Sequence, residues 1–144
     1  MSSQNLLETD FYRQSLSKYE RLKSRKEIDN LFSGGQKLFE YPFLVRWNVT
    51  GLPTKFPAQI LVSVPKKRFK KAVDRIRIKR LIREAYRKNK SGLYRKLSAD
   101  QKQMPIAIVY VGKEMPEYGD TEKKIIILLQ RLLQAYESGR KSYR

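Results

Sequence analysis

The feature that most constrains the fold of this sequence is a basic segment, residues 66–90, in which apolar residues recur at helical spacing. It holds thirteen lysines and arginines against two acids, so it contributes +11 of the chain's net charge of +18. At 100° per residue, one arc of such a helix collects the apolar side chains and one acid: Asp74, Ile78, Leu81, Ile82 and Ala85. We expect this arc to pack on a sheet.

The other side of the same helix is a continuous cationic stripe, made of Arg75, Arg77, Lys79, Arg80, Arg83 and Arg87. Cations three and four residues apart repel one another and weaken a helix, so a partner that relieves the repulsion explains the pattern economically. Phosphates fit, because arginine presents a planar fork of donors and each contact releases a counterion. A solvated helix face is the alternative. Ile76 lies inside the stripe, where a polar residue is expected.

Several classes of chemistry are excluded by composition. The 144 residues include neither cysteine nor histidine, so Ser-His and Cys-His catalysis and the usual transition-metal sites cannot be built. The fourteen acids are scattered, with no close pair on a recognisable scaffold. We therefore expect no active site on this chain. Its length suits one globular domain.

The net charge and the pI of about 10.2 indicate a polyanionic partner, most simply a nucleic acid. A surface charge that serves only solubility is the alternative, but such surfaces mix signs. A helix that reads the DNA major groove would carry Asn or Gln, and residues 72–87 have none. No apolar run approaches the roughly 20 residues of a membrane span, and no signal-peptide pattern is present. We expect a cytoplasmic protein that binds neither DNA nor membrane.

Residues 1–20 show no clear period, and we interpret them as a loosely ordered extension ahead of a single domain, 21–144. The sequence predicts a helix over 25–33, with Ser24 and Glu27 at capping-box spacing and Gly34-Gly35 as a left-handed stop. Alternation over 41–49 predicts a half-buried strand. A second strand is predicted over 58–64, paired with the first.

Beyond the basic segment, residues 91–103 are interpreted as the frayed end of its helix followed by a loop. The apolar, β-branched run 104–112 predicts a central strand covered on both faces. A last helix is predicted over 119–139, capped by Asp120 or Thr121 and ended by Gly139. Together these elements predict an α+β fold in which one sheet of two or three early strands and a later one is covered by helices.

The segments "VSVPKK" (62–67) and "AVDRIRIKRLIREAYR" (72–87) resemble the signature of the bacterial ribonuclease P protein component, which runs Ser-Val-x-Lys-Lys, then Ala-Val-x-Arg-Asn-x-x-Lys-Arg-x-x-Arg-Glu. "RLKSRKEIDNLFSGG" (21–35) is similar to the opening helix of that family. The resemblance spans about 21–137. Two departures stand out: Ile76 replaces the family's Asn, and the turn 68–71 lacks the common Gly-Asn.

The resemblance implies an α/β sandwich of α-β-β-β-α-β-α order with a left-handed crossover through the basic helix. It implies a protein subunit of ribonuclease P that binds the catalytic RNA and the 5′ leader of precursor tRNA and assists endonucleolytic 5′ maturation. It further implies that catalysis belongs to the RNA and its Mg²⁺ ions, with no metal held tightly by the protein. A structural rRNA-binding or ribosome-associated protein with no role in cleavage is the alternative that charge alone fits equally well.

Carried onto matching positions, the resemblance assigns contacts with the catalytic RNA to seven cations: Lys66, Lys67, Arg75, Arg77, Lys79, Arg80 and Arg83. We add Arg87, which belongs to the same cationic stripe. It implies a leader cleft between the first helix and the open sheet face, formed by Ile28, Phe32 and Arg46. Phe32 retains an aromatic ring able to stack on an unpaired base. Core packing for Ile28 and Phe32, and a solvated strand position for Arg46, are equally weighted alternatives.

Overall fold

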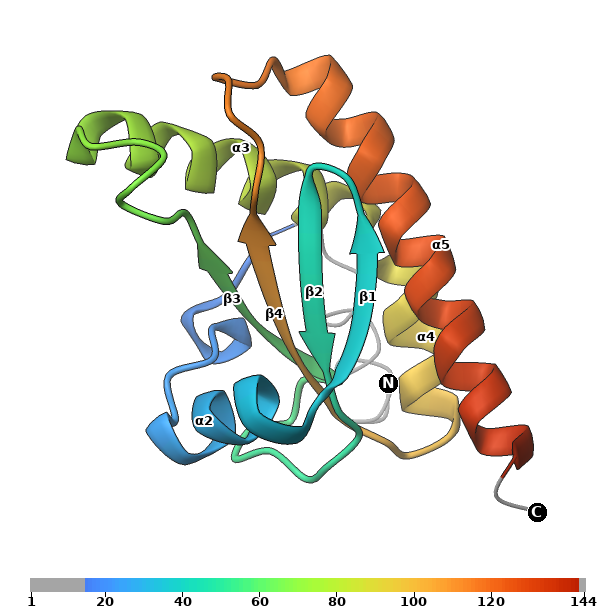
Figure 1. The fold of residues 1–144 in the computed structure, drawn as a ribbon. Coiled ribbons are helices and arrows are strands. Elements are labelled where there is room, and N and C mark those ends of the chain that lie inside the picture. The colour runs from blue at the N-terminus through green and yellow to red at the C-terminus, as the bar shows by residue number, and fades with distance from the viewer. Residues whose placement is uncertain (1–14, 143–144) are drawn as a thin grey trace.

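The computed structural model describes residues 15–142, and Figure 1 shows their arrangement as one sheet with helices on both faces. The elements, in chain order, are η1 (Lys18–Glu20), α2 (Arg25–Gly34), β1 (Gln36–Glu40), β2 (Phe43–Trp47), β3 (Ala58–Ser63), α3 (Ala72–Asn89), α4 (Ser91–Ala99), β4 (Met104–Tyr110) and α5 (Tyr118–Ser142). The expected α+β class is confirmed, with α4 as an addition to the predicted order.

The sheet has the strand order β1-β2-β4-β3. β2 runs antiparallel to both β1 and β4, whereas β3 runs parallel to β4. The predicted pairing of the strands at 41–49 and 58–64 is therefore wrong, because β4 lies between them. β4 is almost wholly buried, so it takes the central place that its apolar sequence predicts.

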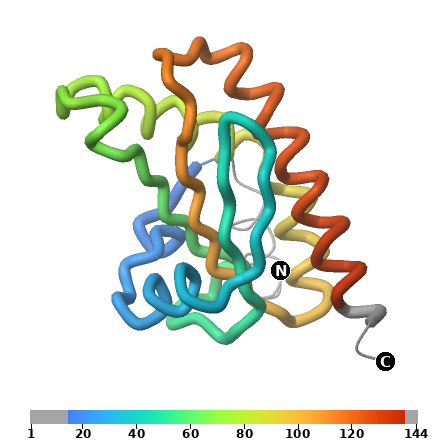
Figure 2. Tube along the Cα trace, in the orientation of Figure 1, coloured from blue at the N-terminus to red at the C-terminus, as the bar shows by residue number. Residues whose placement is uncertain are grey.

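The connection from β3 to β4 runs through α3 and α4, a path that Figure 2 traces. In Figure 1 both strands point upward, β4 lies to the right of β3, and the connecting helices lie behind the sheet. This arrangement is the left-handed crossover that the family resemblance implies. Such a crossover is rare, since about 98% of these connections are right-handed.

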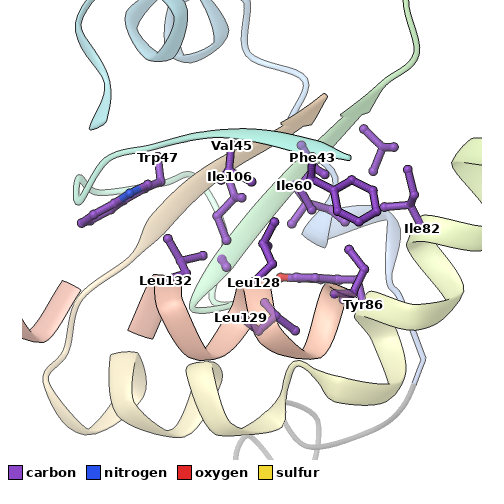
Figure 3. Close-up of a cluster of buried hydrophobic side chains, with 14 of the residues drawn as sticks. Phe43, Val45, Trp47, Ile60, Ile82, Tyr86, Ile106, Leu128, Leu129 and Leu132 are labelled. Carbon is purple, nitrogen blue, oxygen red and sulfur yellow. The ribbon is translucent and has the colours of Figure 1, made fainter. Parts of the chain in front are cut away.

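The main core lies between the sheet and the helices α3, α4 and α5, and Figure 3 shows its centre. Alternate residues of β2, namely Phe43, Val45 and Trp47, point into it, and Leu128 and Leu132 of α5 pack against them. A smaller cluster lies on the other face of the sheet, where α2 packs over β3 and β4: Leu22, Ile28, Leu31, Leu61 and Ala107. The two clusters give the sheet one fully covered face and one partly covered face.

The predicted capping of α2 is confirmed at the start of the helix and is wrong at its end. The Ser24 hydroxyl accepts a hydrogen bond from the Glu27 amide at 3.3 Å, as the capping-box spacing predicts. Gly35 does not adopt the predicted left-handed conformation, because its φ is −71°. It is required for a different reason: a Cβ there would lie 2.6 Å from the Leu31 carbonyl oxygen.

Three further boundaries differ from the predictions. Residues 91–99, expected to be a frayed end and loop, form the helix α4, which buries Leu93, Tyr94 and Leu97. The first of the three early strands, β1, precedes the predicted strand at 41–49, which itself shortens to β2. α5 begins before Asp120 and continues past Gly139, so neither the predicted cap nor the predicted stop operates.

Residues 15–20 of the expected extension lie within the described part of the chain, and residues 1–14 lie outside it. Glu20, at the end of η1, is buried and paired with Lys90 between α3 and α4. The Gln59 side chain donates to the Tyr19 carbonyl at 3.0 Å, and the Leu22 amide donates to the Ile60 carbonyl at 2.8 Å. The segment is thus joined to both β3 and the helical layer.

Candidate nucleic-acid interface

The helix α3 divides into a core side and a cationic side, as the sequence predicts. Ile78, Ile82 and Ala85 are fully buried, and Tyr86 joins them. Leu81 and Asp74, expected in the same arc, are only half-buried. In Figure 1 the first turns of α3 extend beyond β3, away from the sheet. The cationic side is therefore presented on a projecting part of the molecule.

The predicted cations are exposed to different degrees. Arg77 and Arg80 are exposed on α3, and Lys66 and Lys67 are exposed in the turn that follows β3. The remaining four are half-buried: Arg75, Lys79, Arg83 and Arg87. The stripe thus has a fully accessible centre at Arg77 and Arg80.

Arg75 supports the turn before α3. Its Nη1 atom donates to the Phe69 carbonyl at 2.7 Å and to the Lys70 carbonyl at 2.9 Å. Lys71 at the N-cap makes no side-chain capping bond, so Arg75 is the side chain that ties the turn to the helix. It therefore positions the turn as well as contributing charge.

Arg87 is engaged within the helix. Its Nε atom donates to Glu84 at 2.9 Å, and Nη2 forms a second bond to the same carboxylate. These bonds, with Lys88 nearby, lower the pKa of the Glu84 carboxyl, while the bond to Glu84 raises the pKa of Arg87. The C-terminal end of the stripe is thus partly neutralised by the protein itself.

Arg83 lies close to a cation that sequence reasoning missed. Burial lowers the pKa of its guanidinium, and the positive charge of Arg21 lowers it further. Arg21 is exposed, and its backbone forms an isolated parallel β-bridge with Ile60 of β3. This pairing brings Arg21 near Arg83 of α3, although the two residues are 62 positions apart in the sequence. Helical periodicity carries no information about such a long-range approach. The cationic surface therefore extends from α3 onto the segment that precedes α2.

Of the three residues assigned to the leader cleft, Ile28 and Phe32 lie on α2 and Arg46 lies on β2. Phe32 is 41% exposed on α2, whereas Ile28 is half-buried against the smaller apolar cluster. The guanidinium of Arg46 donates to the Phe32 carbonyl at 3.1 Å and to the Gly35 carbonyl at 3.3 Å. Arg46 thus satisfies carbonyls at the end of α2 and fixes this helix to the sheet.

Within residues 15–142, no group of three or more acidic side chains is arranged to hold a metal ion. Over the same range, no helix combines the length and apolar character needed to cross a membrane. The described surface therefore offers cations and exposed rings as its chemically distinctive groups. The fold and this surface define a class: a small α+β protein with a left-handed crossover whose connecting helix displays a cationic face.

Comparison with known proteins identifies the family within that class. The family model described as Ribonuclease P matches residues 16–133. The ribonuclease P protein component of Porphyromonas gingivalis is 42% identical over 108 residues, which are 75% of this chain and 79% of the relative. That of Chlorobium phaeobacteroides is 33% identical over 128 residues, 82% of this chain and 88% of the relative.

A solved structure supports the same assignment. The ribonuclease P protein from Thermotoga maritima superposes with a TM-score of 0.60 at 26% identity, covering 78% of this chain and 96% of that one. The ribonuclease P protein of Staphylococcus aureus, 18% identical with a TM-score of 0.57, shares the fold. The chain belongs to the ribonuclease P protein family, whose known role is the 5′ maturation of tRNA.

Proposed function

We propose that this protein binds the catalytic RNA of ribonuclease P through the cationic side of α3 and the precursor-tRNA leader through the cleft beside α2. The observation that carries the proposal is the division of α3 into a buried apolar side and a projecting cationic side. Phosphate contacts there offset the unfavourable repulsion between neighbouring arginines. The adjacent exposed cations Lys66 and Lys67 extend this surface into the turn.

In this proposal the hydrolysis is carried out by the RNA with its Mg²⁺ ions, in the cytoplasm. The chain has no cysteine or histidine, and its acids within residues 15–142 form no metal-binding group. Its own contribution is to hold the two RNAs. Arg77 and Arg80 contact the backbone of the catalytic RNA, Arg75 holds the turn that carries Lys66 and Lys67, and Phe32 stacks on a leader base.

The test is reconstitution with a bacterial ribonuclease P RNA and a precursor tRNA at low Mg²⁺. Adding the wild-type protein should stimulate release of the 5′ leader, measured on a gel. The double variant Arg77→Gln/Arg80→Gln should stimulate less, because it loses two phosphate contacts. Lys123→Gln, an exposed lysine on α5, is the control for lost charge and should behave as wild type. Absence of stimulation by the wild-type protein would favour a structural rRNA-binding role.

A further inference from the structure

Two aromatic side chains are exposed at the hairpin between β1 and β2. Phe39 is 54% exposed and Tyr41 is 55% exposed. Their rings meet edge to face, with centroids 6.4 Å apart. Single exposed apolar side chains are common on protein surfaces, but two rings in contact form a defined aromatic surface.

The strand register places Phe39 on the sheet face that α2 partly covers. Its neighbour Leu38 pairs with Val45 and packs into the main core, so Phe39 points the opposite way. One row of this face crosses all four strands: Phe39, Leu44, Val109 and Ser63. The preceding row, two residues nearer α2, crosses them as well: Lys37, Arg46, Ala107 and Leu61.

The helix α2 covers the β3 and β4 part of the preceding row and leaves the row of Phe39 open. Ala107 and Leu61 pack in the cluster with Leu31 of α2. In the next row Leu44 and Val109 stay half-buried, and none of the elements drawn in Figure 1 lies in front of this end of the sheet. The two rows are separated by roughly 7 Å along the strands. The open row therefore lies one step beyond the row of Arg46, on the same face of the sheet.

The hairpin is held in place from its other side. Arg131 of α5 donates to the Phe39 carbonyl at 2.7 Å and to the Glu40 carboxylate at 2.9 Å, and Lys124 lies 3.5 Å from the same carboxylate. These bonds fix the backbone of residues 39 and 40 without using the Phe39 ring. A ring presented on an anchored strand loses little freedom when it binds a flat ligand.

The surrounding charge selects the partner. The adjacent row contains two cations, the exposed Lys37 and its strand partner Arg46. The chain as a whole has a net charge of +18. A second copy of the protein would bring the same positive charge to this face. Single-stranded RNA satisfies both features, because its bases stack on aromatic rings and its phosphates are attracted by the cations.

We propose that Phe39, with Tyr41 at its edge, is a stacking site for an unpaired nucleotide of the precursor-tRNA leader, one row of the sheet beyond α2. This site rests on the proposed function. It means that the leader continues past Phe32 and Arg46 as far as the edge strand β1. Affinity for substrate then depends on whether the leader is long enough to reach Phe39.

The experiment crosses Phe39 variants with leader length in the reconstituted holoenzyme. Phe39→Ala should weaken binding of a precursor tRNA with a ten-nucleotide leader by about 5- to 100-fold, and leave a one-nucleotide leader unaffected. Phe39→Trp should retain wild-type affinity, because it keeps a stacking surface. Ile127→Ala removes an exposed apolar side chain from α5 and should change neither dissociation constant.

Each other outcome overturns the site. Equal affinities for wild type and Phe39→Ala with the long leader would leave the proposed function intact and remove Phe39 from it. An equal loss of affinity with both leaders would mean that the ring contacts the catalytic RNA or stabilises the fold. An unchanged thermal midpoint of Phe39→Ala would then indicate the RNA contact, and a lowered one would indicate the role in the fold. Dimers that Phe39→Ala dissociates would assign it to a second copy. Failure of the wild-type protein to stimulate cleavage would overturn the proposed function, and this site with it.

Discussion

Lys90 and Glu20 form a buried ion pair in which the Nζ atom lies 2.7 Å from Oε1 and 2.8 Å from Oε2. Both side chains are 1% exposed. The Lys90 ammonium also donates to the Ser15 carbonyl at 2.6 Å and lies 5.0 Å from the centroid of the Tyr94 ring. Burial raises the pKa of Glu20 and lowers that of Lys90, while their mutual hydrogen bonds oppose both shifts. The pair joins the segment before α2 to the junction of α3 and α4.

Removing one member of this pair should destabilise the fold strongly. Lys90→Met leaves the Glu20 carboxylate buried without its cation, and Glu20→Gln leaves the Lys90 ammonium without its anion. Each change should lower the free energy of unfolding by about 3 to 5 kcal/mol, measured by urea denaturation. The double variant Glu20→Gln/Lys90→Met should lose less than the sum, because neither side chain then carries a buried charge. Additive losses would contradict a direct coupling.

The ion pairs of Glu40 should make stability dependent on acid pH. The hydrogen bond from Arg131, aided by Lys124, lowers the pKa of the Glu40 carboxyl. Between the lowered pKa of folded Glu40 and its ordinary pKa, the unfolded chain therefore binds more protons than the folded protein. The stabilisation by these ion pairs is thus present at neutral pH and is lost as the pH falls through the pKa of folded Glu40. Glu40→Gln should be less stable than wild type at pH 7, and the difference should shrink as the pH falls below the ordinary pKa of a glutamate and through the lowered pKa of folded Glu40.

The measurement for Glu40 is the free energy of urea unfolding at a series of pH values. Asp29→Asn, which removes an exposed carboxylate on α2, serves as the control and should show a smaller difference at pH 7. A difference between wild type and Glu40→Gln that persists unchanged into acid would contradict the assigned cause.

Affinity for the catalytic RNA should fall steeply with salt. About five phosphate contacts predict a slope on the order of −4 in a plot of the logarithm of affinity against the logarithm of salt concentration. Arg77→Gln/Arg80→Gln should reduce the steepness by about 1 to 2, measured by filter binding from low to physiological salt. Lys123→Gln should retain the wild-type slope. A salt-independent affinity would remove the phosphate contacts from α3.

Ile76 should be a position where RNA affinity can be improved. It is 55% exposed within the cationic side of α3, so replacing it costs no core packing. Ile76→Asn supplies an amide able to bond a phosphate, ribose or base edge, and should tighten binding by a few fold, with an unchanged thermal midpoint. Ile76→Ala is the control that removes the apolar group without adding donors. Tighter binding by the alanine variant alone would show that the isoleucine obstructs the RNA.

Features governed by neighbours in the chain were predicted well. The capping bond of Ser24, the alternation of Phe43, Val45 and Trp47, and the buried side of α3 all follow from residues a few positions apart. Weak local patterns were missed. β1 is a polar strand in which Leu38 packs against the main core, and α4 has nine residues, too few for independent stability. Each of these two is stabilised by packing that the chain acquires only on folding.

The candidate site divides in the same way. The sequence by itself determined the cationic side of α3 and the anomaly at Ile76, because one helix brings residues three and four apart onto one surface. Only the tertiary structure decided that β4 separates β2 from β3, that Arg21 approaches Arg83, and that Phe39 lies on the open face. Strand order and the contacts between distant segments depend on how all the apolar surfaces are buried together, and periodicity within one segment does not encode that choice.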